Sequence, residues 1–110
     1  MYQQGDIVIV SFPFTDAANS KPRPAIVLSN RIVNNSQDVI LAQITATIRN
    51  DNFSFALEDR FVDTPLNRQS EIRCHKIFVM EKRLIKKKIS NLIPAQRTIL
   101  FSKICALLQP

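Results

Sequence analysis

The segment Asp6-Ile-Val-Ile-Val-Ser-Phe12 decides the fold class, because it is a nearly continuous run of β-branched residues that stops at Pro13. Such a run is typical of a strand with both faces covered by other parts of the protein. Between Pro13 and Pro24 the chain carries three prolines and several turn-forming residues, which predict an irregular loop from Pro13 to Pro22. A loop of this length in a small domain often has a function.

Further short apolar segments, separated by turn-forming residues, predict a mainly β protein. The expected strands are Ala25–Ser29, Val39–Ile48, Phe53–Leu57, Ser70–Met80 (one strand or two, with a kink near His75) and Lys88–Leu92. Pro94 favours the start of a helix that runs to Leu108, with Ile99, Leu100, Ile104, Leu107 and Leu108 as its apolar stripe. We therefore expect an α+β fold: a small, half-open β-barrel of five to seven strands with a C-terminal helix.

Length and composition are those of one folded domain that spans residues 1–110. Of these residues 45% are hydrophobic and 22% are charged, which is enough apolar material for a core. The net charge is +6, and it is uneven: residues 73–110 hold nine basic side chains and one acidic side chain. A basic half favours a polyanionic partner such as a nucleic acid, or an acidic protein surface.

Several functional classes are excluded by residues that the chain lacks. No apolar run approaches the ~20 residues that span a bilayer, and the first residues do not resemble a signal peptide, so we expect a cytoplasmic protein. Cys74 and Cys105 do not make a disulfide framework. A single histidine and no Cys-x-x-Cys pair predict no metal site, and no cofactor-binding motif is present.

Two polar features interrupt otherwise apolar surroundings and are the candidates for chemistry. Arg23 is flanked by two prolines that restrict its backbone, and its planar guanidinium suits a phosphate group, although an isolated Arg is more often simply solvated. Thr45 and Thr47 alternate in the third predicted strand, so we expect both hydroxyls on one face; β-propensity alone also explains them.

Other polar residues carry weaker signals. The basic run from Lys82 to Lys88 suits a nucleic-acid backbone or a solvated turn. His75 could act as a general base but has no acidic partner at a recognisable spacing, and Cys74 is better explained as a core residue.

Four segments, in this order, resemble the MazF/PemK-like toxins of bacterial type II toxin-antitoxin systems, also known as mRNA interferases. They are Gly5-Asp-Ile-Val-Ile-Val-Ser-Phe-Pro-Phe-Thr-Asp16, Lys21-Pro-Arg-Pro-Ala-Ile-Val-Leu-Ser29, Ala42-Gln-Ile-Thr-Ala46 and Ser70-x-Ile-Arg73. The first two segments are quite specific together, whereas the last alone is weak. The resemblance covers essentially the whole chain.

The resemblance implies an SH3-like barrel of the CcdB/MazF type, a homodimer, and a metal-free endoribonuclease that cleaves single-stranded RNA. The catalytic pair of the family falls on Arg23 and Thr45. The ribose 2′-OH would attack its own phosphate and leave 2′,3′-cyclic phosphate and 5′-OH ends, so no cofactor is expected. Candidates for RNA contact or for support of the site are Lys21, Thr47, Ser70, Arg73 and Phe14, together with the loops Pro13–Pro22 and Asn50–Asn52.

The expected partners are single-stranded RNA and a small antitoxin whose acidic segment covers the basic groove; a DNA-bound complex would form through the antitoxin. Two other functions stay open. One is a non-catalytic, CcdB-like poison that binds a topoisomerase subunit, which would not need Arg23. The other is a degenerate toxin that only binds antitoxin or nucleic acid. The run Lys86–Lys88 and the glycine-free loop before Lys21 depart from the family pattern.

Overall fold

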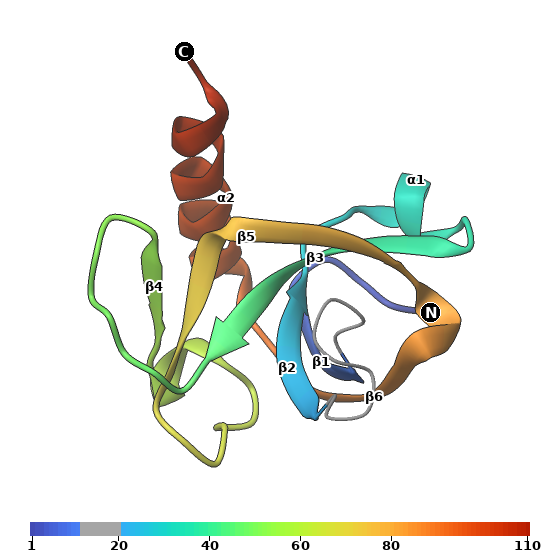
Figure 1. Cartoon of the computed structure of the whole chain (residues 1–110), viewed down its shortest axis with the longest axis horizontal. Coiled ribbons are helices and arrows are strands. Elements are labelled where there is room, and N and C mark those ends of the chain that lie inside the picture. Colours follow the sequence, from blue (N-terminus) through green and yellow to red (C-terminus); the bar gives the residue numbers. More distant parts are fainter. Residues whose placement is uncertain (12–20) are drawn as a thin grey trace.

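The computed structural model describes residues 1–11 and 21–110 (Figure 1). Within these residues, six strands form one antiparallel sheet in the order β4-β5-β3-β2-β1-β6. The strands are β1 (Asp6–Ser11), β2 (Pro22–Val27), β3 (Asp38–Thr45), β4 (Ser54–Leu57), β5 (Ser70–Glu81) and β6 (Ile85–Asn91). The helices are α1 (Arg31–Asn34), the 3-10 turns η2 (Asp59–Phe61) and η3 (Lys82–Leu84), and α2 (Pro94–Leu108). The predicted α+β architecture is confirmed.

The strand boundaries differ from the predicted ones where chain pairing overrides local composition. β2 begins at Pro22, three residues before the predicted start, because residues 22–24 pair only with β1. Residues 25 and 26 pair with both β1 and β3, and Val27 pairs with β3. A proline is tolerated where its missing N–H faces no neighbouring strand. β6 likewise begins earlier, at Ile85. The single turn α1 and the two 3-10 turns were not predicted, whereas α2 has the predicted bounds.

The third strand ends at Thr45, and not at Ile48 as predicted. Apolar residues continue to alternate after Thr45, but the chain leaves the sheet there, and the backbone amides of Arg49 and Asn50 bond to the side chain of Glu71 instead. The expectation that Thr45 and Thr47 lie along one strand is therefore wrong: Thr47 belongs to the loop that follows.

The segment Ser70–Glu81 is one long strand with an irregularity where a kink is predicted. Ile72 pairs with Ile44 and Ile77 pairs with Ala42, so β5 has extra residues around His75 relative to β3. Extra residues of this kind bend a strand. Figure 1 shows β5 turning sharply beside α2, so that its first part pairs with β4 and its second part extends across the sheet.

Two apolar cores lie on the two faces of the sheet. Ile7 belongs to one core, which also contains Leu100 and Ile104 of α2, and the next residue, Val8, belongs to the other. The alternation confirms that β1 is covered on both faces. Ile99, Leu107 and Leu108 remain exposed, so only part of the predicted helical stripe is buried. The reason is that α2 contacts mainly β5 and extends beyond the sheet (Figure 1).

The single glycine, Gly5, fixes the entry into β1. Its φ is +93°, a region that residues with a Cβ rarely adopt, and its backbone bonds to both Val27 and Leu92. A Cβ at this position would lie 2.4 Å from Cδ of Arg97, whose guanidinium donates to the carbonyl of Gln4. We expect Gly5→Ala to lower the free energy of unfolding by about 2 kcal/mol, as strained φ values typically cost ~1–3 kcal/mol.

Chemical denaturation of Gly5→Ala, Arg97→Ala and the double variant measures this effect. Truncating Arg97 removes the steric overlap but not the backbone strain, so the double variant should still be less stable than Arg97→Ala alone. Equal stability of these two variants would show that the positive φ carries no cost.

Candidate active site

An open pocket of about 350 Å³ lies at the end of the sheet where β2 begins and β3 ends. It is lined by Pro22, Arg23 and Pro24 of β2, by Ile44, Thr45 and Ala46, by residues 66–68 and Ser70, and by single residues of β1 and β6. We call it the Arg23 pocket. Two residues that the sequence singled out separately, Arg23 and Thr45, thus meet in one cavity. The strand order explains this, because β2 and β3 are antiparallel neighbours.

Arg23 is held by its backbone and has an open side chain. It pairs with Val10 of β1, between two prolines that pair with β1 on either side of it. The residue is exposed, and no hydrogen bond or ion pair of its guanidinium exists with residues 1–11 or 21–110. An unpaired guanidinium on a fixed backbone is ready to receive an anion with two oxygens, such as a phosphate.

The hydroxyl of Thr45 has a defined orientation. Its Oγ1 accepts a hydrogen bond of 3.1 Å from the backbone N–H of Thr47. Since one lone pair is used in this way, the hydroxyl proton is free to be donated to a group in the pocket. Thr47 itself is exposed and does not line the pocket, so its contribution in the described structure is its amide.

The loop before β5 contributes a second cation that the sequence analysis missed. Arg68 and Asn67 line the Arg23 pocket, and Arg68 is exposed. In the sequence, residues 58–69 lie between the predicted strands Phe53–Leu57 and Ser70–Met80, so only a connecting loop is expected there. The only available signal was the position of Arg68 two residues before Ser70, where the motif Ser70-x-Ile-Arg73 begins.

Ser70, a candidate for support of the site, bonds to this loop. Its buried hydroxyl donates to the carbonyl of Arg68 at 3.0 Å. This bond holds the backbone of Arg68 next to the pocket. Lys21, another candidate for RNA contact, is exposed just before β2 and does not line the pocket. Phe14 and residues 12–20 lie outside the described part of the structure.

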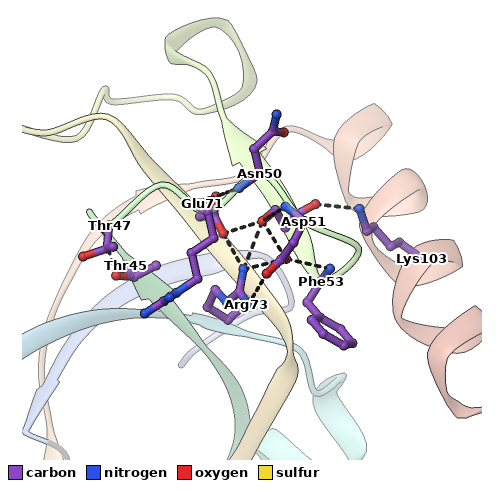
Figure 2. Close-up of polar contacts among 10 residues, drawn as sticks. Thr45, Thr47, Asn50, Asp51, Phe53, Glu71, Arg73 and Lys103 are labelled. Atoms are coloured by element: carbon purple, nitrogen blue, oxygen red, sulfur yellow. Dashed lines mark hydrogen bonds and ion pairs between the residues drawn. The ribbon is translucent and has the colours of Figure 1, made fainter.

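Arg73 does not line the pocket; Figure 2 shows it at the centre of a polar cluster beside Thr45. Its guanidinium binds both carboxylate oxygens of Asp51, at 2.9 and 3.0 Å, and one oxygen of Glu71 at 2.6 Å. It also donates to the hydroxyl of Ser54. We call Asp51, Ser54, Glu71 and Arg73 the Arg73 cluster. Its geometry is that of a structural support, and no side of the guanidinium is open to RNA.

The cluster shifts the ionisation of its members. The hydrogen bond from Arg73 holds the pKa of Asp51 well below its ordinary value of 3.8. For Glu71, burial raises the pKa, but hydrogen bonds from Ser54, Arg73 and the amides of Asn50 and Arg49 outweigh it, so the pKa lies below 4.5. The hydrogen bond to Asp51 raises the pKa of Arg73. All three groups are therefore charged at neutral pH.

These shifts predict acid-sensitive stability. Because the folded-state pKa values of Asp51 and Glu71 are depressed, their stabilisation is fully present above the unfolded-state values and is lost as the pH falls below about 4. We expect the melting temperature to fall more steeply from pH 4.5 to pH 2.5 in the wild type than in Asp51→Asn. Parallel melting curves for the two proteins would contradict the assignment.

The remaining candidates lie outside the pocket. The His75 ring stacks on Phe53 with centroids 3.9 Å apart, and burial, helped by Arg73 and Lys76, lowers its pKa. Both cysteines are free. In the basic run, Lys82 donates to the carbonyl of Asn34 and Lys88 pairs with Asp6, whereas Lys86 and Lys87 are exposed on β6. Across residues 1–11 and 21–110, no three His, Cys, Asp or Glu side chains group as metal ligands would.

Comparison with known protein families shows which family the chain belongs to. Residues 3–108 match the model of the PemK-like, MazF-like toxins of type II toxin-antitoxin systems. The chain belongs to this toxin family. Among curated protein sequences, no match is found. In the described part of the toxin, no helix is long and apolar enough to cross a membrane.

Solved structures confirm the fold of the toxin. A mycobacterial endoribonuclease in complex with its cognate antitoxin has a TM-score of 0.81 at 18% identity, covering 100% of this chain and 98% of that chain. The Mycobacterium tuberculosis toxin MazF-mt6 has a TM-score of 0.76 at 22% identity (94% and 95% covered). A structure of a MazE-MazF complex from Deinococcus radiodurans has a TM-score of 0.79 at 16% identity, covering 97% of this chain and 95% of that chain. The predicted CcdB/MazF-like barrel with a C-terminal helix is thereby confirmed.

Proposed function

We propose that this toxin is a sequence-selective, metal-independent endoribonuclease that cleaves single-stranded RNA, with mRNA as its target, and so inhibits translation and growth. The observation that carries the proposal is the convergence of Arg23 and Thr45 in one open pocket. Family membership and the net charge of +6 support it. Residues 1–110 would act as one domain.

The reaction needs no nucleophile from the protein. The ribose 2′-oxygen forms a bond to the adjacent phosphorus, the bond from phosphorus to the 5′-oxygen breaks, and the 2′ proton is balanced by protonation of the leaving 5′-oxygen. The products are a 2′,3′-cyclic phosphate and a 5′-OH. Arg23 would neutralise the charge that develops on the phosphate, and the Thr45 hydroxyl would donate to a nonbridging oxygen. Neither role calls on a cofactor.

Further residues would bind the RNA on either side of the reacting phosphate. Arg68 lines the same pocket as Arg23, so it is placed to bind a neighbouring phosphate, and Lys21 and the exposed Lys86 and Lys87 would add attraction that depends on salt. Phe14 and the loop 13–22, together with Asn50–Asn52, remain the candidates for selecting bases, since single-stranded RNA is read through unstacked bases.

The partner of the toxin would be a small antitoxin with an acidic segment. Two of the similar structures are described as complexes with an antitoxin, and residues 73–110 of this chain are strongly basic. An acidic segment bound to these basic residues would block the RNA, and the affinity of the antitoxin for the toxin would fall with rising salt. We further propose a homodimer in the cytoplasm, and contact with DNA only through the antitoxin.

The experiment that tests this function is incubation of the pure toxin with a long single-stranded RNA in EDTA, followed by analysis of the product ends. Fragments with 2′,3′-cyclic phosphate and 5′-OH ends support the proposal. RNA that stays intact with excess folded protein would refute it and favour a toxin that acts by binding.

A further inference from the structure

The loop between β3 and β4, residues 46–53, leaves the sheet directly after Thr45 and is held by one buried side chain. Glu71 is the cross-strand partner of Thr45, and only 2% of its side chain is exposed. One carboxylate oxygen accepts from the backbone N–H groups of Arg49 (3.0 Å) and Asn50 (3.2 Å). The other accepts from Ser54 and from Arg73. Glu71 thus binds both the loop and the strand that follows it.

Arg73 of β5 and Asp51 of the loop make a second attachment. The carboxylate of Asp51 accepts hydrogen bonds from both terminal nitrogens of Arg73, and it also accepts one from the backbone N–H of Phe53 at 3.0 Å. Lys103 of α2 donates to the carbonyl oxygen of Ser54 at 2.6 Å. Figure 2 shows Lys103 extending from α2 toward the cluster. Asn50 has a positive φ of 49°, so the chain turns tightly where Glu71 holds it. The second half of the loop is therefore fixed to β5, and the first residue of β4 is fixed to α2.

The first half of the loop makes the contact that matters for chemistry. The N–H of Thr47 is the donor that orients the hydroxyl of Thr45, and Thr47 lies two residues before the first amide that Glu71 holds. Figure 2 shows Thr45 and Thr47 beside the Arg73 cluster, on the side away from Lys103. A loop released from Glu71 would no longer fix the Thr47 amide, and the Thr45 hydroxyl could rotate away from the phosphate.

We propose that Glu71 is a positioning residue for RNA cleavage, which acts through the 46–53 loop on the hydroxyl of Thr45, with Arg73 and Asp51 holding Glu71 and the loop in place. This inference rests on the proposed function. It assigns a role in the reaction to Glu71 and Arg73, which are buried, and to the exposed Asp51, although none of the three lines the pocket. A displacement of a reacting group by about 1 Å can cost ~100-fold in rate, so a residue of this kind affects turnover without touching the RNA.

Glu71→Gln is the informative variant, because it keeps the shape of the side chain. The carboxylate accepts four hydrogen bonds through two oxygens, whereas the amide has one acceptor oxygen and an NH2 group that cannot accept. In Glu71→Gln, either the two loop amides or the donors Ser54 and Arg73 must therefore lose their hydrogen-bond acceptor. We expect the cleavage rate at saturating RNA to fall by about tenfold or more, while KM changes less than about threefold.

Measuring Glu71→Gln in a Thr45→Val protein distinguishes a positioning role of Glu71 from a general contribution to the folded structure. If Glu71 acts through Thr45, Glu71→Gln causes little further loss in the Thr45→Val protein, and the two effects are strongly non-additive. Glu58→Gln is the matched control, since it removes the acid of an exposed ion pair with Arg60 (3.1 Å) and should leave the rate unchanged. All rates are compared well below the melting temperature of the least stable variant.

Three results would overturn the proposal: an unchanged maximal rate in Glu71→Gln, an equal loss in the wild-type and Thr45→Val backgrounds, or a change confined to KM. If Glu71→Gln does not fold, Asp51→Asn is measured in the same two backgrounds, with a smaller loss and the same non-additivity expected. A wild type that does not cleave RNA refutes the proposed function as well, whereas an active wild type with an unaffected Glu71→Gln variant refutes this inference alone.

Discussion

Replacing Arg23 with alanine is expected to lower the rate of RNA cleavage by about 10²–10³-fold, the usual cost of removing one donor that stabilises transition-state charge. The side chain is exposed at the edge of the Arg23 pocket and its backbone pairs with β1, so the fold should not change. Cleavage of a fluorescent single-stranded RNA, with circular dichroism of the same samples, measures both properties.

Two further variants define what the loss means. Arg23→Lys keeps the charge but not the planar fork, so an intermediate rate is expected. Arg31→Ala removes another exposed arginine, on α1, that does not line the pocket, and this variant should cleave at the wild-type rate. Wild-type activity in Arg23→Ala would remove Arg23 from the site and favour a toxin that acts by binding a protein target.

The largest expected effect on stability comes from Arg73→Met. This change leaves Glu71, which is almost fully buried, without the cation that it binds at 2.6 Å. Breaking a buried ion pair by removing one partner typically costs about 3–5 kcal/mol, because the remaining charge stays desolvated. Urea denaturation at pH 7 measures the difference in the free energy of unfolding.

The double variant Arg73→Met, Glu71→Leu is the control for this interpretation. If the cost arises from an unpaired carboxylate, removing that carboxylate should restore part of the stability, as apolar replacements of buried pairs often do. A double variant less stable than Arg73→Met would instead show that Glu71 stabilises the loop amides even without the arginine.

The fold could largely be predicted from the sequence because its strands carry strong local signals. The run after Asp6 indicated a strand covered on both faces, and Ile7 and Val8 indeed enter different cores. Pro94 marked the start of α2. The end of β3 and the start of β6 were misplaced, since alternating apolar residues continue past Thr45 and the pairing of Ile85 with Val10 is a long-range property.

The candidate site was predictable only in part, for a similar reason. Arg23 and Thr45 stand out locally, as an arginine between prolines and as a polar end of an apolar strand. Arg68 has no such local signal, because only the folded loop brings it to the pocket. The partners of Arg73 were equally invisible: Asp51 is 22 residues away in the sequence. The antiparallel pairing of β4 with β5 brings them together.

In the proposed reaction, the Arg23 pocket promotes attack by a ribose 2′-OH. The most direct test is cleavage of one RNA oligonucleotide that contains a preferred cut site, compared with the same oligonucleotide carrying a single deoxyribose 5′ of the cut phosphate. We expect that the all-ribose strand is cut in EDTA and that the substituted strand binds with similar affinity but stays intact at that position. Cleavage of both strands at the same phosphate would show that the nucleophile is not the 2′-OH and would contradict this role of the pocket.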